Sequence, residues 1–118
     1  MVVLGVEHLD RSVDLFRRVY GWPAPETGED PDLGARLANF SGTPVTLAAA
    51  SAESGWLAER LAQYGESPCA FLLGAADVDT IARHFPLAGS GSWFGHRIMW
   101  FDPARLNGIR LGLVAQGL

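Results

Sequence analysis

The chain repeats a stretch of its own sequence about 69 positions later, and this repeat narrows the folds that it can adopt. Segment 2–16 aligns without a gap on segment 71–85, and each copy has the pattern of a strand followed by a helix. The identical pairs are Leu4 with Leu73, Gly5 with Gly74, Asp10 with Asp79 and Phe16 with Phe85. A repeat of this length in 118 residues predicts two structural modules of about 55 residues each, with any binding site where the modules meet.

Composition predicts one globular domain without a nucleic-acid or membrane partner. Of the 118 residues, 48% are hydrophobic and 19% are charged, which suits a chain that buries one core. The net charge of −4 argues against a nucleic acid or an anionic membrane as a partner. No apolar run approaches the roughly 18 residues of a membrane span, and we find no secretory signal pattern. With Cys69 as its single cysteine, we expect a cytoplasmic protein.

Local patterns predict the order strand, helix and then two or three strands in each half. The expected strands lie at 2–6, 35–40, 43–50, 69–73, 96–101 and 109–114. The first helix is expected to have Asp10 as its N-cap and to stop at Gly21, and the second to cover 79–85. Two segments are expected to be loops: 23–32, which holds three prolines and four acids, and 87–92, which holds small residues.

Several motifs resemble the vicinal oxygen chelate (VOC) superfamily, which includes glyoxalase I, extradiol dioxygenases, methylmalonyl-CoA epimerase, and fosfomycin- and bleomycin-resistance proteins. The matching motifs are 9–13 with Phe16, 19–22, 64–66, 100–103 and 107–108. The resemblance implies a homodimer and an α+β fold, in which paired βαβββ modules form a curved mixed sheet around a cavity. The expected parts of this single domain are module 1 at about 1–52, a connecting helix at about 54–65 and module 2 at about 68–118.

Most enzymes of this superfamily hold a metal between two histidines on the first strands of the modules and two oxygen donors on the last strands. Carried over by motif, these positions fall on Met1, 68–70, Thr46 or Ala48, and Gly112. None of them is His, Asp or Glu, whereas a divalent metal needs imidazole or carboxylate donors. We therefore expect neither a metal nor another cofactor.

Strand alternation places mostly small residues on the cavity side of the expected strands, which leaves space for an organic ligand. The candidate ligand-binding residues are Arg36, Ala48, Ala70, Leu72, Trp93, Trp100, Arg110 and Gly112. The two indoles would stack on a flat ligand and offer N–H donors. Arg110 binds a carboxylate or phosphate if it faces the cavity, and otherwise lies in solvent at the strand end. The alternative for the whole set is an ordinary core, in which large neighbours fill the space.

Two functions of different class fit these features. The missing metal ligands and the four tryptophans favour a metal-independent protein of the bleomycin-resistance type, which sequesters an aromatic or largely apolar small molecule. The alternative is a VOC enzyme of the lyase, isomerase or dioxygenase type, either metal-free or with unconventional metal ligands. His96, at the opening of a strand, is the candidate general base for such an enzyme.

Overall fold

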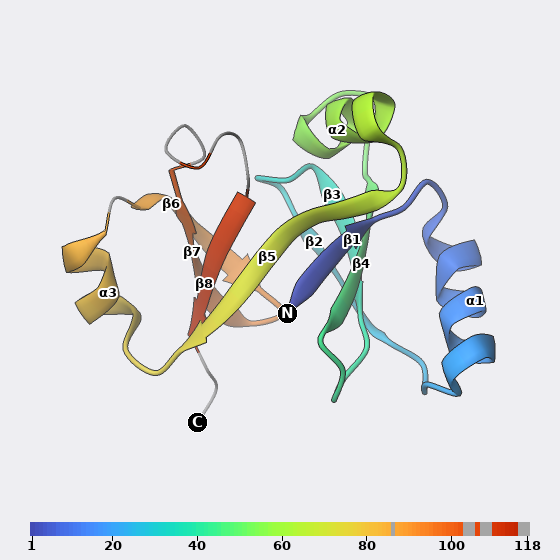
Figure 1. Ribbon diagram of the computed structural model, residues 1–118, viewed down its shortest axis with the longest axis horizontal. Coiled ribbons are helices and arrows are strands. Elements are labelled where there is room, and N and C mark those ends of the chain that lie inside the picture. The colour runs from blue at the N-terminus through green and yellow to red at the C-terminus, as the bar shows by residue number, and fades with distance from the viewer. Residues whose placement is uncertain (86, 103–105, 107–109, 116–118) are drawn as a thin grey trace. The chain divides into compact units, whose positions relative to one another are not determined.

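A computed structural model describes residues 1–85, 87–102, 106 and 110–115, and the chain divides into two compact units, 1–69 and 70–118 (Figure 1). Along the chain, each module contributes a strand, a helix and three strands, in that order. This order confirms the expected α+β class with two βαβββ modules. Segment 102–108, which holds parts of two of the matching motifs, lies largely outside the described residues.

The first unit is built on four strands, with one helix against them and a second helix after them. Its elements are β1 (Val2–Gly5), α1 (Leu9–Tyr20), β2 (Glu26–Asp30), β3 (Ala35–Asn39), β4 (Val45–Ala50) and α2 (Trp56–Tyr64). The strands lie in the order β2-β3-β4-β1, with β1 parallel to β4 and the other neighbours antiparallel. Because β1 and β4 are parallel, the chain crosses over between them through α1 and the β2-β3 hairpin.

The second unit repeats this arrangement. Its elements are β5 (Ser67–Ala75), α3 (Val78–His84), β6 (Leu87–Trp93), β7 (His96–Phe101) and β8 (Arg110–Ala115), with the start of β5 belonging to the first unit. The strand order is β5-β8-β7-β6, with β5 parallel to β8 and the remaining pairs antiparallel. The strand that opens each module therefore pairs in parallel with the strand that closes it.

The sequence repeat sets where both helices begin. α1 starts at Leu9 and α3 starts at Val78, which are equivalent positions of the repeat. The expected N-cap at Asp10 is wrong, because the N-cap residues are His8 and Asp77. Asp77 caps α3 by accepting a hydrogen bond from the Thr80 backbone N–H, whereas the side chain of His8 makes no capping hydrogen bond. The helices thus begin earlier than the repeated aspartates indicated.

Two segments that were expected to be loops are strands. The segment 23–32 contains β2, which pairs with β3 from Glu26 opposite Asn39 to Asp30 opposite Ala35. The segment 87–92 lies in β6, which pairs with β7. Neither segment has apolar residues in alternation. Their strand conformation therefore comes from backbone hydrogen bonds to a neighbouring strand, and not from the burial of side chains. The register of β6 shifts between Leu87 and Gly89, which is typical of a β-bulge at the edge of a sheet.

The core of the first unit lies between α1 and one face of its sheet. Val6, Leu9, Ala38, Phe40, Leu47 and Ala49 form a buried cluster there. Phe16 and Trp22 pack against this cluster, with their ring centroids 6.1 and 5.0 Å from that of Phe40. Because side chains alternate along β4, Thr46 and Ala48 lie on the opposite face from this core.

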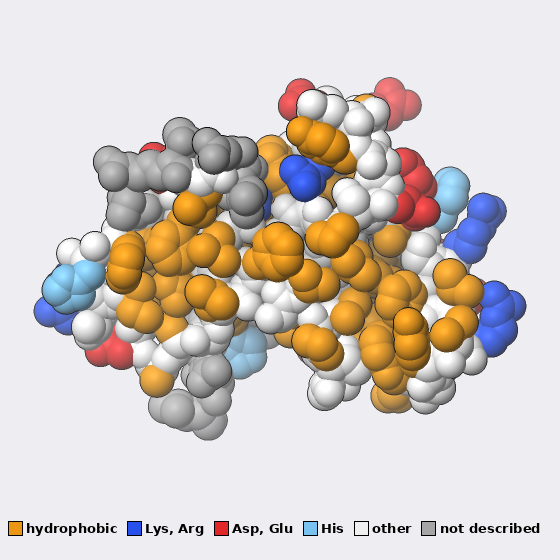
Figure 2. All heavy atoms as spheres, in the orientation of Figure 1, with side chains coloured by type: hydrophobic (Ala, Val, Ile, Leu, Met, Phe, Trp, Pro, Cys, Tyr) orange, Lys and Arg blue, Asp and Glu red, His pale blue; other side chains and the backbone are white. Residues whose placement is uncertain are grey.

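The core of the second unit is smaller and leaves part of β5 uncovered. Ala75, Val78 and Leu113 are buried, and Met99 and Phe101 of β7 pack against them. Phe71 and Leu73 of β5 are 43% and 52% exposed. Figure 2 shows hydrophobic side chains gathered over β5 and β8 on the face in view. α3 is only seven residues long, and Phe71 and Leu73 of β5 remain open to solvent.

Candidate functional site on the sheet of the second unit

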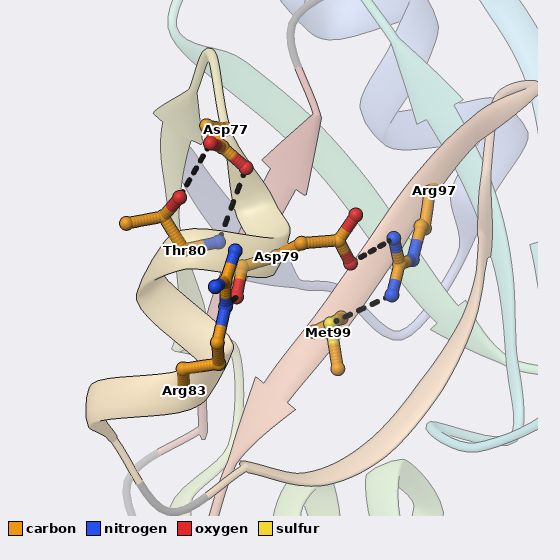
Figure 3. Close-up of polar contacts among 6 residues, drawn as sticks. All are labelled: Asp77, Asp79, Thr80, Arg83, Arg97 and Met99. Atoms are coloured by element: carbon orange, nitrogen blue, oxygen red, sulfur yellow. Dashed lines mark hydrogen bonds and ion pairs between the residues drawn. The ribbon is translucent and has the colours of Figure 1, made fainter.

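Contacts with α3 identify the side chains of β7 that lie on the helix side of the sheet (Figure 3). The guanidinium of Arg97 forms an ion pair with the Asp79 carboxylate at 2.7 Å, and Met99 packs in the core beside α3. Because successive residues of a strand point to opposite faces, Ile98 and Trp100 lie on the other side of the sheet. The candidate site is on that side.

Two tryptophans form the centre of this face. Trp100 of β7 and Trp93 at the end of β6 are 2% and 3% exposed. Their rings lie edge to face, with centroids 6.3 Å apart and an interplanar angle of 80°. This is a favoured geometry for aromatic pairs, since the electropositive edge of one ring meets the electronegative face of the other.

The hairpin between β6 and β7 fixes Trp93 in place. Its two-residue loop, Phe94 and Gly95, has positive φ angles of 50° and 80°. Such a loop fits the type I′ turn, whose twist matches that of the flanking strands. Trp93 and His96 are direct partners across this hairpin, so their side chains share a face of the sheet. The exposed imidazole of His96 therefore lies beside the buried indole of Trp93.

Gly112 lets the ring of Trp100 lie close to β8. The two residues are direct partners in the register of β7 and β8. A Cβ atom added at Gly112 would lie 3.0 and 3.1 Å from ring carbons of Trp100 and 2.8 Å from a methyl carbon of Leu72. Contacts this short force a neighbour to move, so a side chain at this position is incompatible with the observed packing.

Arg110 and the end of β5 complete the group. The guanidinium carbon of Arg110 lies 5.8 Å from the ring centroid of Trp100, within the range of a cation–π contact. Ala70 pairs with Arg110 and Leu72 pairs with Gly112 in the parallel register of β5 and β8. Six of the eight candidate ligand-binding residues thus lie together on one face of one sheet: Ala70, Leu72, Trp93, Trp100, Arg110 and Gly112.

Both indoles carry a buried N–H group without an acceptor. The Nε1 atoms of Trp93 and Trp100 have no hydrogen-bond partner among the described residues and almost no contact with solvent. Leaving such a donor unpaired costs about 1–3 kcal/mol. Buried donors without an acceptor are uncommon in native proteins, so each one needs a physical explanation.

The other two candidate residues lie in the first unit and do not share a face with each other. Ala48 is fully buried on the face opposite α1, in register with Leu37. Arg36 pairs with Ala49, so it lies on the same side as α1. There it borders two adjoining surface hollows of about 300 and 280 Å³, which share Leu9, Asp10 and Arg36. The expectation that Arg36 faces the same side as Ala48 is therefore wrong.

The superfamily's metal positions do not fit a divalent cation in this chain. In the first unit they fall on Met1 and Thr46, and the Thr46 hydroxyl lies 2.9 Å from Asn39 Oδ1 and 3.2 Å from Met1 Sδ. The remaining positions fall on 68–70 and Gly112, and among these only Cys69 has a side chain with a donor atom. A thioether and a hydroxyl do not form the donor set that such a metal prefers. No cluster of three or more His, Cys, Asp or Glu suited to a metal occurs in the part of the chain that the structure describes.

Cys69 is not suited to nucleophilic chemistry. Burial raises the pKa of its thiol to about 11, against a smaller opposing effect of the Arg60 guanidinium. The thiolate is the reactive form of cysteine, so this side chain is inert near neutral pH. Cys69 is a small buried residue of β5.

One residue of the site was not found from the sequence. Gly89 of β6 is the direct partner of Trp100 across the strand pair, and a Cβ atom added there would meet no described atom within 4 Å. Gly89 therefore leaves open space on the same face of the sheet as Trp100. The alternation of residues along 87–93 places Gly89 on the same face as Trp93. This alternation could be used only if the segment had been predicted to be a strand.

Comparisons with known proteins show the fold. No family model matches the chain, and no curated protein matches it. Among solved structures, methylmalonyl-CoA epimerase from Mycobacterium tuberculosis matches with a TM-score of 0.83 at 20% identity, over 99% of this chain and 86% of that one. A variant of the Streptomyces coelicolor epimerase, in complex with 2-nitronate-propionyl-CoA, matches with a TM-score of 0.79 at 25% identity, over 98% and 92%. A hypothetical protein from Bacillus halodurans gives 0.79 at 10% identity, over 99% and 92%.

These likenesses give the chain the fold of the VOC superfamily, to which methylmalonyl-CoA epimerases belong. They also correct one expectation. A binding protein that sequesters a ligand was the favoured function, but the named structures that match are enzymes of the isomerase type. The comparisons therefore favour the enzymatic alternative. None of the described helices is long and apolar enough to cross a membrane.

Proposed function

We propose that this protein is a metal-independent isomerase, which moves a proton at the carbon next to the carbonyl group of an acyl thioester. The observation that carries the proposal is the backbone match to methylmalonyl-CoA epimerases over nearly the whole chain. Such epimerases have been solved in complex with methylmalonyl-CoA and with 2-nitronate-propionyl-CoA. A fold can host many chemistries, so the reaction must be supported by the site itself.

The face around Trp100 has side chains suited to such a proton transfer. In the first step His96 takes the proton from the carbon, and the electrons of the broken C–H bond move onto the carbonyl oxygen as an enolate. The positive charge of Arg110, next to Trp100, lowers the energy of that anion. In the second step the exposed His96 imidazolium, whose proton exchanges with solvent, protonates the same carbon. The proton adds to the other face when the planar enolate has turned over, the enolate electrons form the new C–H bond, and the carbonyl is restored. No electron acceptor or further reactant is needed.

The experiment is a deuterium-exchange assay in deuterium oxide. The purified protein is incubated with methylmalonyl-CoA and, separately, with propionyl-CoA, and deuterium at the carbon beside the thioester is followed by mass spectrometry. We expect exchange with at least one of the two, at a rate that a metal chelator does not change. Exchange that stops with the chelator and returns with a divalent metal contradicts metal independence, and no exchange above the protein-free rate contradicts the isomerase function.

A matched pair of variants tests the role of His96. His96→Gln removes the base and is expected to lower the exchange rate by about 100-fold or more, since a positioned general base contributes at least that much. His84→Gln removes another exposed imidazole, on α3, and is expected to keep the rate of the natural chain. If both variants exchange at the natural rate, His96 is not the base.

A further inference from the structure

Two large apolar side chains of β5, Phe71 and Leu73, form an open strip on the same side of the sheet as α3. They are 43% and 52% exposed, and we call them the β5 strip. In the parallel register they pair with Leu111 and Leu113 of β8, and Leu113 is buried in the core beside α3. Because partners in neighbouring strands share a face, the strip lies on the helix side of the sheet. The helix therefore covers Leu113 and leaves the strip open.

The strands that carry and border the β5 strip have almost no charged side chains, although 19% of the chain's residues are charged. β5 holds no Asp, Glu, Lys or Arg, and the one charged residue of β8 is Arg110. Alternation places Arg110 on the opposite face from Leu111 and therefore away from the strip. The side chains of the two strands thus give the strip no charge with which to recognise a charged peptide, a nucleic acid or an anionic lipid surface.

An uncharged strip of this kind suits a second copy of the same chain. With a net charge of −4, two copies repel each other, so they associate best through a face that carries no charge. A two-fold axis between Phe71 and Leu73 would place each Phe71 ring against Leu73 of the second copy, which makes the strip complementary to itself. Apolar and aromatic side chains without charges are also what the core of a homodimer interface contains.

We propose that two copies of this chain associate face to face through β5, with Phe71 and Leu73 of each copy at the centre of the interface. The burial of these side chains in the dimer drives the association. The proposal concerns an interface and is independent of the isomerase function, so either one can fail without the other.

The test uses two variants of the full chain with opposite charges on the strip. The acidic variant carries Phe71→Asp and Leu73→Asp, and the basic variant carries Phe71→Lys and Leu73→Lys. Because like charges would meet across the two-fold axis, we expect the dissociation constant of each variant alone to rise about 100-fold or more. In an equal mixture the charges are opposite, and we expect dimers of one acidic and one basic chain. Sedimentation velocity measures the association, and native mass spectrometry identifies the mixed dimer by its mass.

Each outcome of this test decides the proposal. Single chains in the separate variants and mixed dimers in the mixture support it. If the acidic or the basic variant dimerises alone as the natural chain does, or if the mixture stays single, β5 is not the interface. If the natural chain itself is single at every concentration, no such dimer forms. If that single chain binds vesicles of neutral phosphatidylcholine, the strip contacts lipid instead, and the proposal is again wrong.

The matched control places charges on another pair of exposed apolar side chains. Leu15 and Val19 of α1 are 47% and 61% exposed, and neither lies on β5. We expect the chain with Leu15→Asp and Val19→Asp to dimerise as the natural chain does. If it loses association as fully as the acidic β5 variant, the effect is not specific to the strip, and the proposal is contradicted.

A milder variant keeps the proposal testable if the charged chains do not fold. Leu73→Thr removes apolar surface from the strip, and threonine, which is β-branched, is well suited to a strand. We expect this variant to keep the circular dichroism spectrum of the natural chain and to raise the dissociation constant of the dimer about tenfold. A folded Leu73→Thr chain that dimerises as tightly as the natural chain would show that Leu73 lies outside the interface, and the proposal would be overturned.

Discussion

At the scale of single residues, Gly112 shows how a missing side chain shapes the site. The ring of Trp100 and a methyl group of Leu72 occupy the space that a Cβ atom would take. We expect Gly112→Ala to push the ring away and to lower the free energy of unfolding by about 1–3 kcal/mol, the usual cost of overpacking. Urea unfolding measures this change, and near-ultraviolet circular dichroism reports the displaced indole.

The matched control for this substitution is Gly89→Ala on β6. Its new methyl group meets open space, so the free energy of unfolding should stay within about 0.5 kcal/mol of the natural value. If both variants lower the free energy of unfolding by the same amount, the close contact at Gly112 does not cause the destabilisation.

At the scale of elements, the start of α3 depends on one carboxylate. Hydrogen bonds from the Thr80 hydroxyl, and then from the Thr80 backbone N–H, lower the pKa of Asp77 below its ordinary value of 3.8 (Figure 3). Because the folded pKa is lowered, ionised Asp77 stabilises the fold above pH 3.8, and this stabilisation is lost as the pH falls through the lower folded value. Asp77→Asn keeps a capping side chain without the charge. We therefore expect the variant to be less stable than the natural chain at neutral pH, with the gap closing in acid.

Chemical unfolding at a series of pH values measures that gap. Asp14→Asn, which removes an exposed carboxylate of α1, serves as the control and should show a small difference from the natural chain at every pH. A gap for Asp77→Asn that stays constant down to strong acid would show that the charge on Asp77 does not stabilise α3.

Also at this scale, the elements show how far a sequence predicts such a fold. The repeat located the equivalent strands and helices, because buried apolar positions return with the same spacing in both copies. Alternation along β5 and β8 placed Leu72 and Gly112 on one face, as the structure has them. Arg36 was expected at the cavity by analogy with Arg110, but it lies on the side of α1. The strands β2 and β6 were missed because their conformation comes from pairing with a neighbouring strand and leaves no apolar pattern. The open position at Gly89 was hidden for the same reason.

At the scale of the whole molecule, the homodimer that the superfamily resemblance implies remains a prediction. If only folded chains associate, a higher protein concentration favours the dimer and therefore the folded state. The midpoint of thermal unfolding must then rise with protein concentration. Sedimentation equilibrium is expected to give twice the mass of one chain, and a calorimetric dilution series to lower the midpoint. A single-chain mass together with a midpoint independent of concentration would contradict the dimer. The second measurement is needed because a weak dimer that dissociates in the centrifuge still shifts the midpoint at calorimetric concentrations.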